Sequence, residues 1–263
     1  MCDTCGCSDS NERYTINRPE DNKKKPTGQN HDHNHSHGHG HGHGHGFEKT
    51  KSETIEIASA VLSKNNLVAE RNRGYFEAKK IKAFNMVSSP GSGKTTILEK
   101  LTSLLKDKKE IYVIEGDQQT LNDAERIHKA GAKAIQINTG NGCHLDAEMV
   151  NNAVKELEPA DNSLLFIENV GNLVCPAMFD LGESSRIVIA SVTEGHDKPL
   201  KYPNMFETSQ LCVINKTDLL PYVEFDIEEF KSNALRINHH LDFIETSATK
   251  GDGLNDFIKW VMS

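Results

Sequence analysis

The sequence lacks several features that define other classes of protein. The 263-residue chain has no run of eighteen apolar residues, so we expect no membrane-spanning helix and no membrane insertion. Its first residues include neither a basic start nor an apolar stretch, which argues against a secretory signal and favours a cytoplasmic protein. An excess of basic charge is also missing, since the formal net charge is −8. Nucleic-acid binding needs a basic face, so we expect no nucleic-acid partner.

Apolar side chains are almost absent from the first fifty residues, whereas the rest has the composition of an ordinary globular domain. Residues 8–52 contain prolines, a lysine cluster and alternating histidine and glycine, which predicts a disordered linker. Between residues 53 and 80 apolar side chains recur at a spacing near that of a helix, which predicts a helical segment. We expect that segment to pack on one domain at residues 81–263.

Short segments rich in valine and isoleucine alternate with helical stretches after residue 80. Most are apolar on both faces, as a parallel sheet buried between helices requires. We therefore predict an α/β fold with a doubly wound, mostly parallel sheet and flanking helices, preceded by the disordered tail. The predicted strands are Ile81–Val87, Ile111–Ile114, Ala134–Ile137, Leu164–Ile167, Arg186–Ser191, Leu211–Ile214 and Phe243–Glu245.

The segment SSPGSGKTT, residues 88–96, follows the first predicted strand and opens a helix, which is typical of a P-loop NTPase. Its glycines let successive backbone N–H groups face phosphate oxygens, and its lysine would reach the β- and γ-phosphates. Ser88 stands where the P-loop pattern has glycine, which we interpret as a mild departure. The residues assigned to the nucleotide are Gly91, Ser92, Gly93, Lys94, Thr95 and Thr96, with Mg²⁺ on the Thr95 hydroxyl.

A second motif, NKTD, follows the strand predicted at Leu211–Ile214 and indicates the base. The carboxylate of Asp218 can accept from both N1–H and the 2-amino group of guanine, and adenine offers no such donor pair. Ser247 and Ala248 open the sequence SATK after the last strand, which is typical of a weaker element that contacts guanine O6. The sequence therefore favours GTP and GDP, bound by Asn215, Lys216, Asp218, Ser247 and Ala248.

Carboxylates near strand ends are the candidates for catalysis. Glu168 ends an apolar strand, where a P-loop protein holds Mg²⁺, although the following ENVG replaces the DxxG of most GTPases. Asp117 and Asp123 would either assist Mg²⁺ and the attacking water or cap helices, and the residues alone leave both readings open. With Lys94 these acids make the catalytic set. We expect slow GTP hydrolysis, since no arginine finger or catalytic glutamine can be named.

Three thiols at residues 1–7 indicate a metal site. Cys2, Cys5 and Cys7 lie in the sequence CxxCGC, and thiolates are soft ligands that a short loop can wrap around one ion. If Met1 is removed, the free N-terminal amine would complete a planar set of three sulfurs and one nitrogen suited to Ni(II). Zinc would bind the same thiols with tetrahedral geometry.

A second metal site is predicted at Cys143, His144 and Cys175, for nickel or zinc. These residues would converge within one chain or across a two-fold axis with a second copy. Cys212 lies inside an apolar strand and is interpreted as a core residue. The alternating histidines would add loose, low-affinity nickel binding, unless they are an expression tag, which their internal position disfavours. These histidines are His31, His33, His35, His37, His39, His41, His43 and His45.

The combination of CxxCGC, the histidine run, SSPGSGKT, EGDQQT, NTGxxCH, ENVGNLVCP and NKTD resembles the HypB family, nickel-binding GTPases of [NiFe]-hydrogenase maturation. The resemblance implies the dimeric SIMIBI class of P-loop GTPases, with dimers formed on GTP or metal binding. It implies high-affinity nickel at the N-terminal cysteines and Mg²⁺-linked acids at Asp123 and Glu168. It also implies that Lys201 reaches the nucleotide of the partner subunit.

The same resemblance implies partners and a process. A GTPase of this family would store Ni(II) and deliver it to the precursor of the hydrogenase large subunit, together with the companion maturation factor HypA. Two alternatives remain open at this point. One is an accessory GTPase of urease maturation, although the Cys-Pro-His motif of that family is absent here. The other is a nickel storage protein in which GTP binding is vestigial.

Overall fold

The computed structural model describes residues 14–19, 51–117, 122–140 and 142–263. Its strands form one sheet in the order β1-β4-β3-β5-β2-β6-β7-β8. All neighbouring strands run parallel except β1, which is antiparallel to β4. The strands are β1 (Thr15–Asn17), β2 (Lys82–Ser88), β3 (Ile111–Asp117), β4 (Lys133–Asn138), β5 (Leu164–Glu168), β6 (Ser185–Ser191), β7 (Leu211–Asn215) and β8 (Asp242–Glu245).

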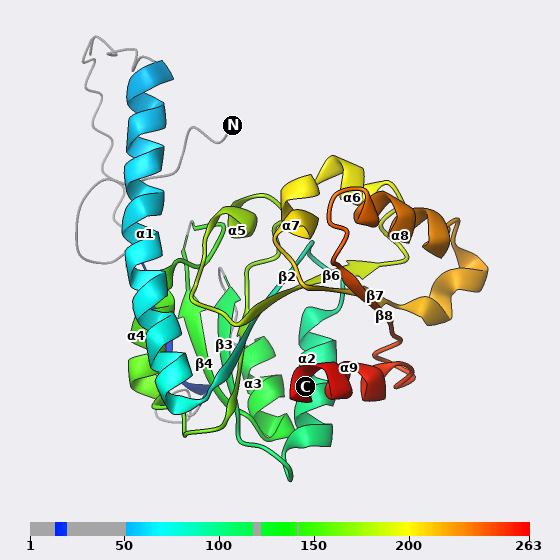
Figure 1. Cartoon of the computed structure of the whole chain (residues 1–263). Helices are drawn as coiled ribbons and strands as arrows, with labels where there is room; N and C mark the ends of the chain where they lie inside the picture. Colours follow the sequence, from blue (N-terminus) through cyan, green and yellow to red (C-terminus); the bar gives the residue numbers. More distant parts are fainter. Residues whose placement is uncertain (1–13, 20–50, 118–121, 141) are drawn as a thin grey trace, which may run out of the picture.

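Helices cover both faces of the sheet, and the long α1 runs along one side of the molecule (Figure 1). The α-helices are α1 (Lys51–Lys79), α2 (Lys94–Leu105), α3 (Asn122–Ala130), α4 (Ala147–Leu157), α5 (Cys175–Met178), α6 (Lys198–Lys201), α7 (Pro203–Glu207), α8 (Ile227–Leu235) and α9 (Leu254–Met262), and η2 (Thr217–Tyr222) is a 3₁₀-helix. The doubly wound α/β fold predicted from the sequence is confirmed. Within the described part of the chain, no helix combines the length and the hydropathy that crossing a bilayer needs.

The central strand β2 shows why the strand sequences are apolar throughout. Phe84 and Met86 point into a core shared with α2, α3 and α9, whereas Ala83 and Val87 belong to cores on the opposite face. Successive side chains of a strand point to opposite faces, so a strand covered on both sides needs apolar residues at nearly every position. All seven predicted strands are present, with ends shifted by up to three residues.

The prediction of a disordered linker over residues 8–52 is wrong for Thr15–Asn17. These residues form β1, where Ile16 pairs with Ile137 of β4. Tyr14 and Ile16 also pack against the core between the sheet and α1. The composition averaged over residues 8–52 is polar and therefore did not indicate this strand. Two apolar side chains, Tyr14 and Ile16, are enough to hold three residues against the open edge of the sheet at β4. Helix α1 begins at Lys51, so the boundary predicted at residue 53 is two residues late.

Topology places the functional loops. The strands from β2 to β7 are parallel neighbours, so their carboxyl ends meet at one edge of the sheet. In an open α/β sheet, ligands bind in the crevice outside that edge. The phosphate-loop, acidic, metal and NKTD motifs all leave the sheet there.

Candidate functional site

The phosphate loop joins β2 to α2 and forms one wall of a cavity of about 570 Å³. Gly91 and Gly93 have φ values of 75° and 99°, in the left-handed region that favours glycine. A Cβ on Gly93 would lie 2.5 Å from Nδ2 of Asn215, so a larger residue does not fit. Among the described residues, no side chain caps the start of α2. Its first N–H groups therefore remain available to phosphate oxygens.

The lysine of the loop is buried and charged groups surround it. Lys94 Nζ donates to Ser88 Oγ at 2.7 Å, and Ser92 Oγ donates to the same oxygen at 2.6 Å. Burial lowers the pKa of Lys94, although Glu168 and Glu194 favour its charged form. Ser88, which departs from the P-loop pattern, thus contributes a hydroxyl that holds the lysine within the loop.

Acidic side chains gather on the other side of the cavity. Thr95 Oγ1 lies 2.8 Å from Glu168 Oε1 and 3.4 Å from Asp123 Oδ2. Burial raises the pKa of Glu168, and its Oε2 has no hydrogen-bond partner among the described residues. A hydroxyl and two carboxylates, one of which has an unpartnered buried oxygen, are the ligand chemistry that Mg²⁺ prefers. The donor set therefore fits the predicted cation.

Sequence reasoning missed Glu115, which lines the same cavity. It is 3% exposed, and its Oε2 also lacks a partner among the described residues. Burial, together with the charges of Glu168 and Asp123, raises the pKa of Glu115 to about 9. A carboxyl inside an otherwise apolar strand, two positions before Asp117, was the available signal. Asp117 itself lines the cavity.

The arginine beside these acids was also missed. Arg126 lines the cavity and donates to Asp123 Oδ1 at 2.9 Å and to Glu99 Oε2 at 2.8 Å. It lies one helical turn after Asp123, so the pair follows from their spacing on α3.

The NKTD and SATK motifs meet the phosphate loop directly. Asn215 Nδ2 donates to the carbonyl of Ser92 at 2.9 Å, and its Oδ1 accepts from the N–H of Ala248 at 3.2 Å. Lys216 Nζ donates to the carbonyl of Gly91 at 2.7 Å. Ser247 Oγ donates to Asp218 Oδ1 at 2.6 Å, which orients that carboxylate. Three loops far apart in the sequence are thus hydrogen-bonded into one wall.

The structure brings Cys143, His144 and Cys175 together within one chain. Their ligand atoms all lie within 4.8 Å of one another, and Cys143 Sγ is 3.6 Å from His144 Nδ1. Burial lowers the pKa of His144, which favours the neutral ring that binds metals. Two thiols and an imidazole suit nickel or zinc. Cys212 is fully buried in β7, as the core interpretation predicted.

Lys201 lies apart from the cavity, where its Nζ is 2.6 Å from Asp197 Oδ2. Of the two lysines in KPLK, the one that contacts the phosphate loop is Lys198, which is buried, pairs with Glu194 and donates to Ser89 Oγ at 2.7 Å. The sequence alone does not distinguish the two lysines, because both belong to the basic stretch KPLK. The predicted role of Lys201 concerns a partner subunit and stays a prediction.

The metal sites predicted in the N-terminal part of the chain fall on residues that the structure does not describe. Cys2, Cys5 and Cys7 lie outside the described ranges, and so do the histidines at residues 31–45.

The model of the CobW/HypB/UreG nucleotide-binding domain matches residues 82–245. The hydrogenase maturation factor HypB of Rhizobium leguminosarum bv. viciae is 54% identical over 212 residues, which cover 81% of this chain and 71% of that relative. The chain belongs to the HypB family. Its nucleotide-binding domain therefore contains the cavity described above.

Two solved HypB structures share this architecture. The HypB of Archaeoglobus fulgidus is 39% identical with a TM-score of 0.72, over 76% of this chain and 98% of that one. The HypB of Helicobacter pylori, crystallised in complex with nickel, is 38% identical with a TM-score of 0.70, over 76% of this chain and 94% of that one. Both structures therefore share the fold described here.

Proposed function

We propose that the protein is a nickel-binding GTPase that stores Ni(II) and delivers it to the precursor of the [NiFe]-hydrogenase large subunit, in the cytoplasm. One observation carries this proposal: the cavity acid Glu168 ends β5 and the metal-site thiol Cys175 begins α5, only seven positions later in the chain. The nucleotide and metal sites are therefore built from the same segment. Movement of Glu168 on GTP hydrolysis would be felt at Cys175.

GTP is held by the residues around the cavity. Lys94 leaves Ser88 to bind the β- and γ-phosphates, and the N–H groups of residues 91–96 surround them. Asp218, oriented by Ser247, accepts from the N1–H and 2-amino groups of guanine. Lys216 lies over the phosphate loop beside the base.

Hydrolysis is assigned to the acidic side of the cavity. Thr95, Asp123 and Glu168 would hold Mg²⁺, which supplies positive charge against the charge that develops on the transferred phosphoryl group. Asp117 orients the attacking water from the end of β3, and Arg126 keeps Asp123 in place. We expect slow turnover, because the described residues that line the cavity include no glutamine that could orient the attacking water.

Nickel is the cargo, and the chain offers it two thiol sites. Cys143, His144 and Cys175 bind nickel or zinc near the nucleotide, and Cys2, Cys5 and Cys7 form the high-affinity site of residues 1–7. The histidines at residues 31–45 bind further nickel with low affinity. GTP or metal binding favours a homodimer in which Lys201 reaches the partner's nucleotide, and HypA assists the delivery.

The relative that is 54% identical is a hydrogenase maturation factor, which favours hydrogenase maturation over urease maturation. A nickel store with vestigial GTP binding fits the intact P-loop, NKTD and acidic cluster poorly. Deleting residues 31–45 distinguishes a nickel storage protein from a maturation GTPase. A storage protein would lose its cellular role, whereas a maturation GTPase would keep hydrogenase activity when nickel is ample.

A transfer assay tests the proposal. Nickel-loaded protein is mixed with the metal-free precursor of the hydrogenase large subunit and GTP, and nickel in the precursor is measured over time. We expect transfer with GTP and little transfer with the Lys94→Ala variant, which cannot hold the phosphates. Equal transfer by both proteins would contradict the GTP-dependent delivery.

A further inference from the structure

Asn169 lies directly after Glu168 and is 1% exposed. Asn169 lines the nucleotide cavity, and its side chain is hydrogen-bonded to the first of two metal loops, the one that carries Cys143 and His144. The second metal loop is the segment that carries Cys175. Asn169 Oδ1 accepts from the N–H of Leu145 at 3.1 Å and from its neighbour Val170 at 3.0 Å. Leu145 is the residue after His144, so the end of β5 is tied to the loop of two metal ligands.

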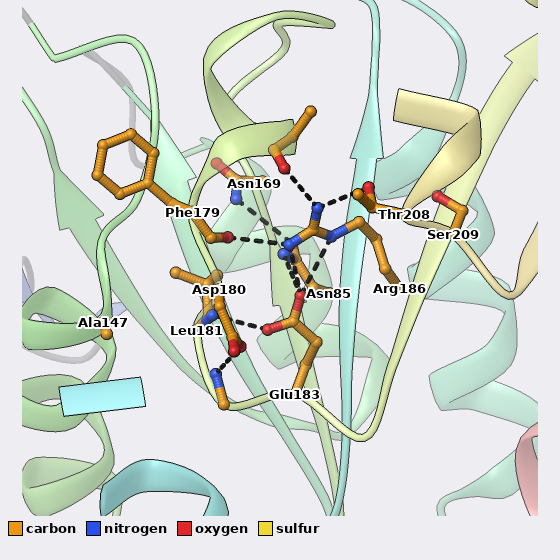
Figure 2. A network of polar contacts seen from close by, with 12 residues as sticks. Asn85, Ala147, Asn169, Phe179, Asp180, Leu181, Glu183, Arg186, Thr208 and Ser209 are labelled. Atoms are coloured by element: carbon orange, nitrogen blue, oxygen red, sulfur yellow. Dashed lines mark hydrogen bonds and ion pairs between the residues drawn. The ribbon is translucent and has the colours of Figure 1, made fainter. Parts of the chain in front are cut away.

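The side chain of Asn169 also begins a path of hydrogen bonds that leads toward the second metal loop, which carries Cys175 (Figure 2). Asn169 Nδ2 donates to Asn85 Oδ1 at 3.3 Å, and Asn85 Nδ2 donates to Glu183 Oε1 at 3.0 Å. Glu183 is paired at 2.9 Å with Arg186, and both side chains are almost fully buried. The polar chain therefore runs from β5 through β2 to the start of β6.

The path ends on the segment that carries Cys175. Arg186 donates to the carbonyl of Ala177 at 2.9 Å and to that of Phe179 at 2.9 Å (Figure 2). The ring of Phe179 stacks on His144, with ring centroids 4.0 Å apart. Asn169 is thus joined to both halves of the cluster formed by Cys143, His144 and Cys175.

This position requires an amide side chain. An asparagine offers an acceptor to Leu145 and a donor to Asn85 at once, whereas a charged aspartate has no donor and leucine has neither. Leaving a buried polar group unpaired is costly, so the end of β5 and the two metal loops must move together or break a hydrogen bond. A short, fully buried connection of this kind can carry coupling between two sites.

We propose that Asn169 is the positioning residue that couples the bound nucleotide to nickel affinity, by tying the end of β5 to both metal loops. This inference rests on the proposed function, since it presumes that nickel affinity responds to the nucleotide. It adds the residue through which the response passes.

The test measures nickel affinity with GDP and with a non-hydrolysable GTP analogue. The full-length chain carries Cys2→Ala, Cys5→Ala and Cys7→Ala, and the thiolate–nickel absorbance reports the internal site alone. We expect a ratio of at least about 5 between the two nucleotide states, in the usual range of coupling energies, and a ratio below about 2 for Asn169→Ala. The ratio is the readout, because a merely weakened site would bind less nickel in both states.

Asn151→Ala is the matched control, since Asn151 Nδ2 also donates to an asparagine, Asn72, at 2.8 Å but outside this path. It should keep the ratio of the parent. A parent protein without coupling would sink the proposed function, whereas a coupled parent with an equally coupled Asn169→Ala variant would overturn the role of Asn169 alone.

A measurement on the unsubstituted protein covers the case in which Asn169→Ala does not fold. Amide hydrogen exchange of residues 143–147 is compared in the two nucleotide states. The proposal expects the Leu145 amide, which bonds to Asn169, to change its exchange rate by at least about 5-fold. Identical rates would overturn it.

Discussion

The hydroxyl of Thr95 contacts the carboxylate of Glu168 at 2.8 Å, which joins the first turn of α2 to the strand that leads to Cys175. Thr95 thus belongs to the phosphate-loop motif, and Glu168 is the last residue of β5, seven positions before the metal ligand Cys175. The contact is the point at which nucleotide chemistry can reach the metal cluster.

Replacing Thr95 with alanine should lower GTP turnover by on the order of 100-fold, since a single aligned group at the transferred phosphoryl is worth about that much. Thr95→Ser keeps the hydroxyl and should retain most of the activity. Phosphate release at saturating GTP and Mg²⁺ measures both. Equal activity of Thr95→Ala and the parent would remove Thr95 from the proposed magnesium site.

Asp218→Asn should exchange the base preference. The amide can no longer accept from both N1–H and the 2-amino group of guanine, but it can donate to the 2-oxo group of xanthine. We expect GTP affinity to fall by about 100-fold or more, in line with the loss of two charge-assisted hydrogen bonds, and xanthosine triphosphate to bind better than GTP. Competition binding with both nucleotides checks this, and unchanged GTP affinity would refute the base assignment.

Cys175→Ser should abolish tight nickel binding at the internal site, because a neutral hydroxyl is a poor substitute for a thiolate. Affinity should fall by at least about 100-fold, more than the loss of a supporting contact causes. Cys212→Ala is the matched control, since Cys212 is fully buried in β7 away from the cluster. Loss of nickel binding in the control would point to unfolding instead.

The buried pair of Glu183 and Arg186 predicts a pH dependence of stability. Burial disfavours the charge of Glu183, but Arg186, Asn85 and backbone N–H groups outweigh it, so the pKa of Glu183 lies below its ordinary value of 4.5. A carboxyl with a lowered pKa stabilises the fold above its unfolded-state pKa. That stabilisation is lost as the pH falls through the folded-state pKa, which lies below 4.5.

Glu183→Gln tests this dependence. The variant leaves Arg186 buried without its counter-charge, so we expect about 3 kcal/mol less free energy of unfolding at pH 7. Its stability should also fall less steeply than that of the parent below the ordinary carboxyl pKa. Urea denaturation of both proteins across that range gives the comparison. Parallel curves would show that Glu183 does not contribute the acid dependence.

The phosphate loop and NKTD could be predicted because their chemistry is contained in a few consecutive residues. Convergence of Cys143 and His144 with Cys175 followed from topology, since both segments leave one sheet edge. Glu115 was harder to find, because a single acid in an apolar strand has no motif. The strand Thr15–Asn17 was missed because its partner, β4, lies more than a hundred residues away.

The path through Asn169, Asn85 and Glu183 was beyond sequence reasoning for the same reason. Asn85 stands in the middle of β2, where the sequence pattern shows only a polar interruption of an apolar strand. Its meaning depends on Glu183, ninety-eight positions later, which reaches it across the sheet. Such pairings are decided by tertiary packing and leave no local signature.

Nickel affinity of the internal site in the two nucleotide states tests the central claim most directly. The full-length chain with Cys2, Cys5 and Cys7 replaced by alanine is loaded with GDP or with a non-hydrolysable GTP analogue and titrated with nickel. We predict dissociation constants that differ by at least about 5-fold, and a matching difference in nucleotide affinity with and without nickel, because coupling is reciprocal. Equal nickel affinity in both states would contradict the account.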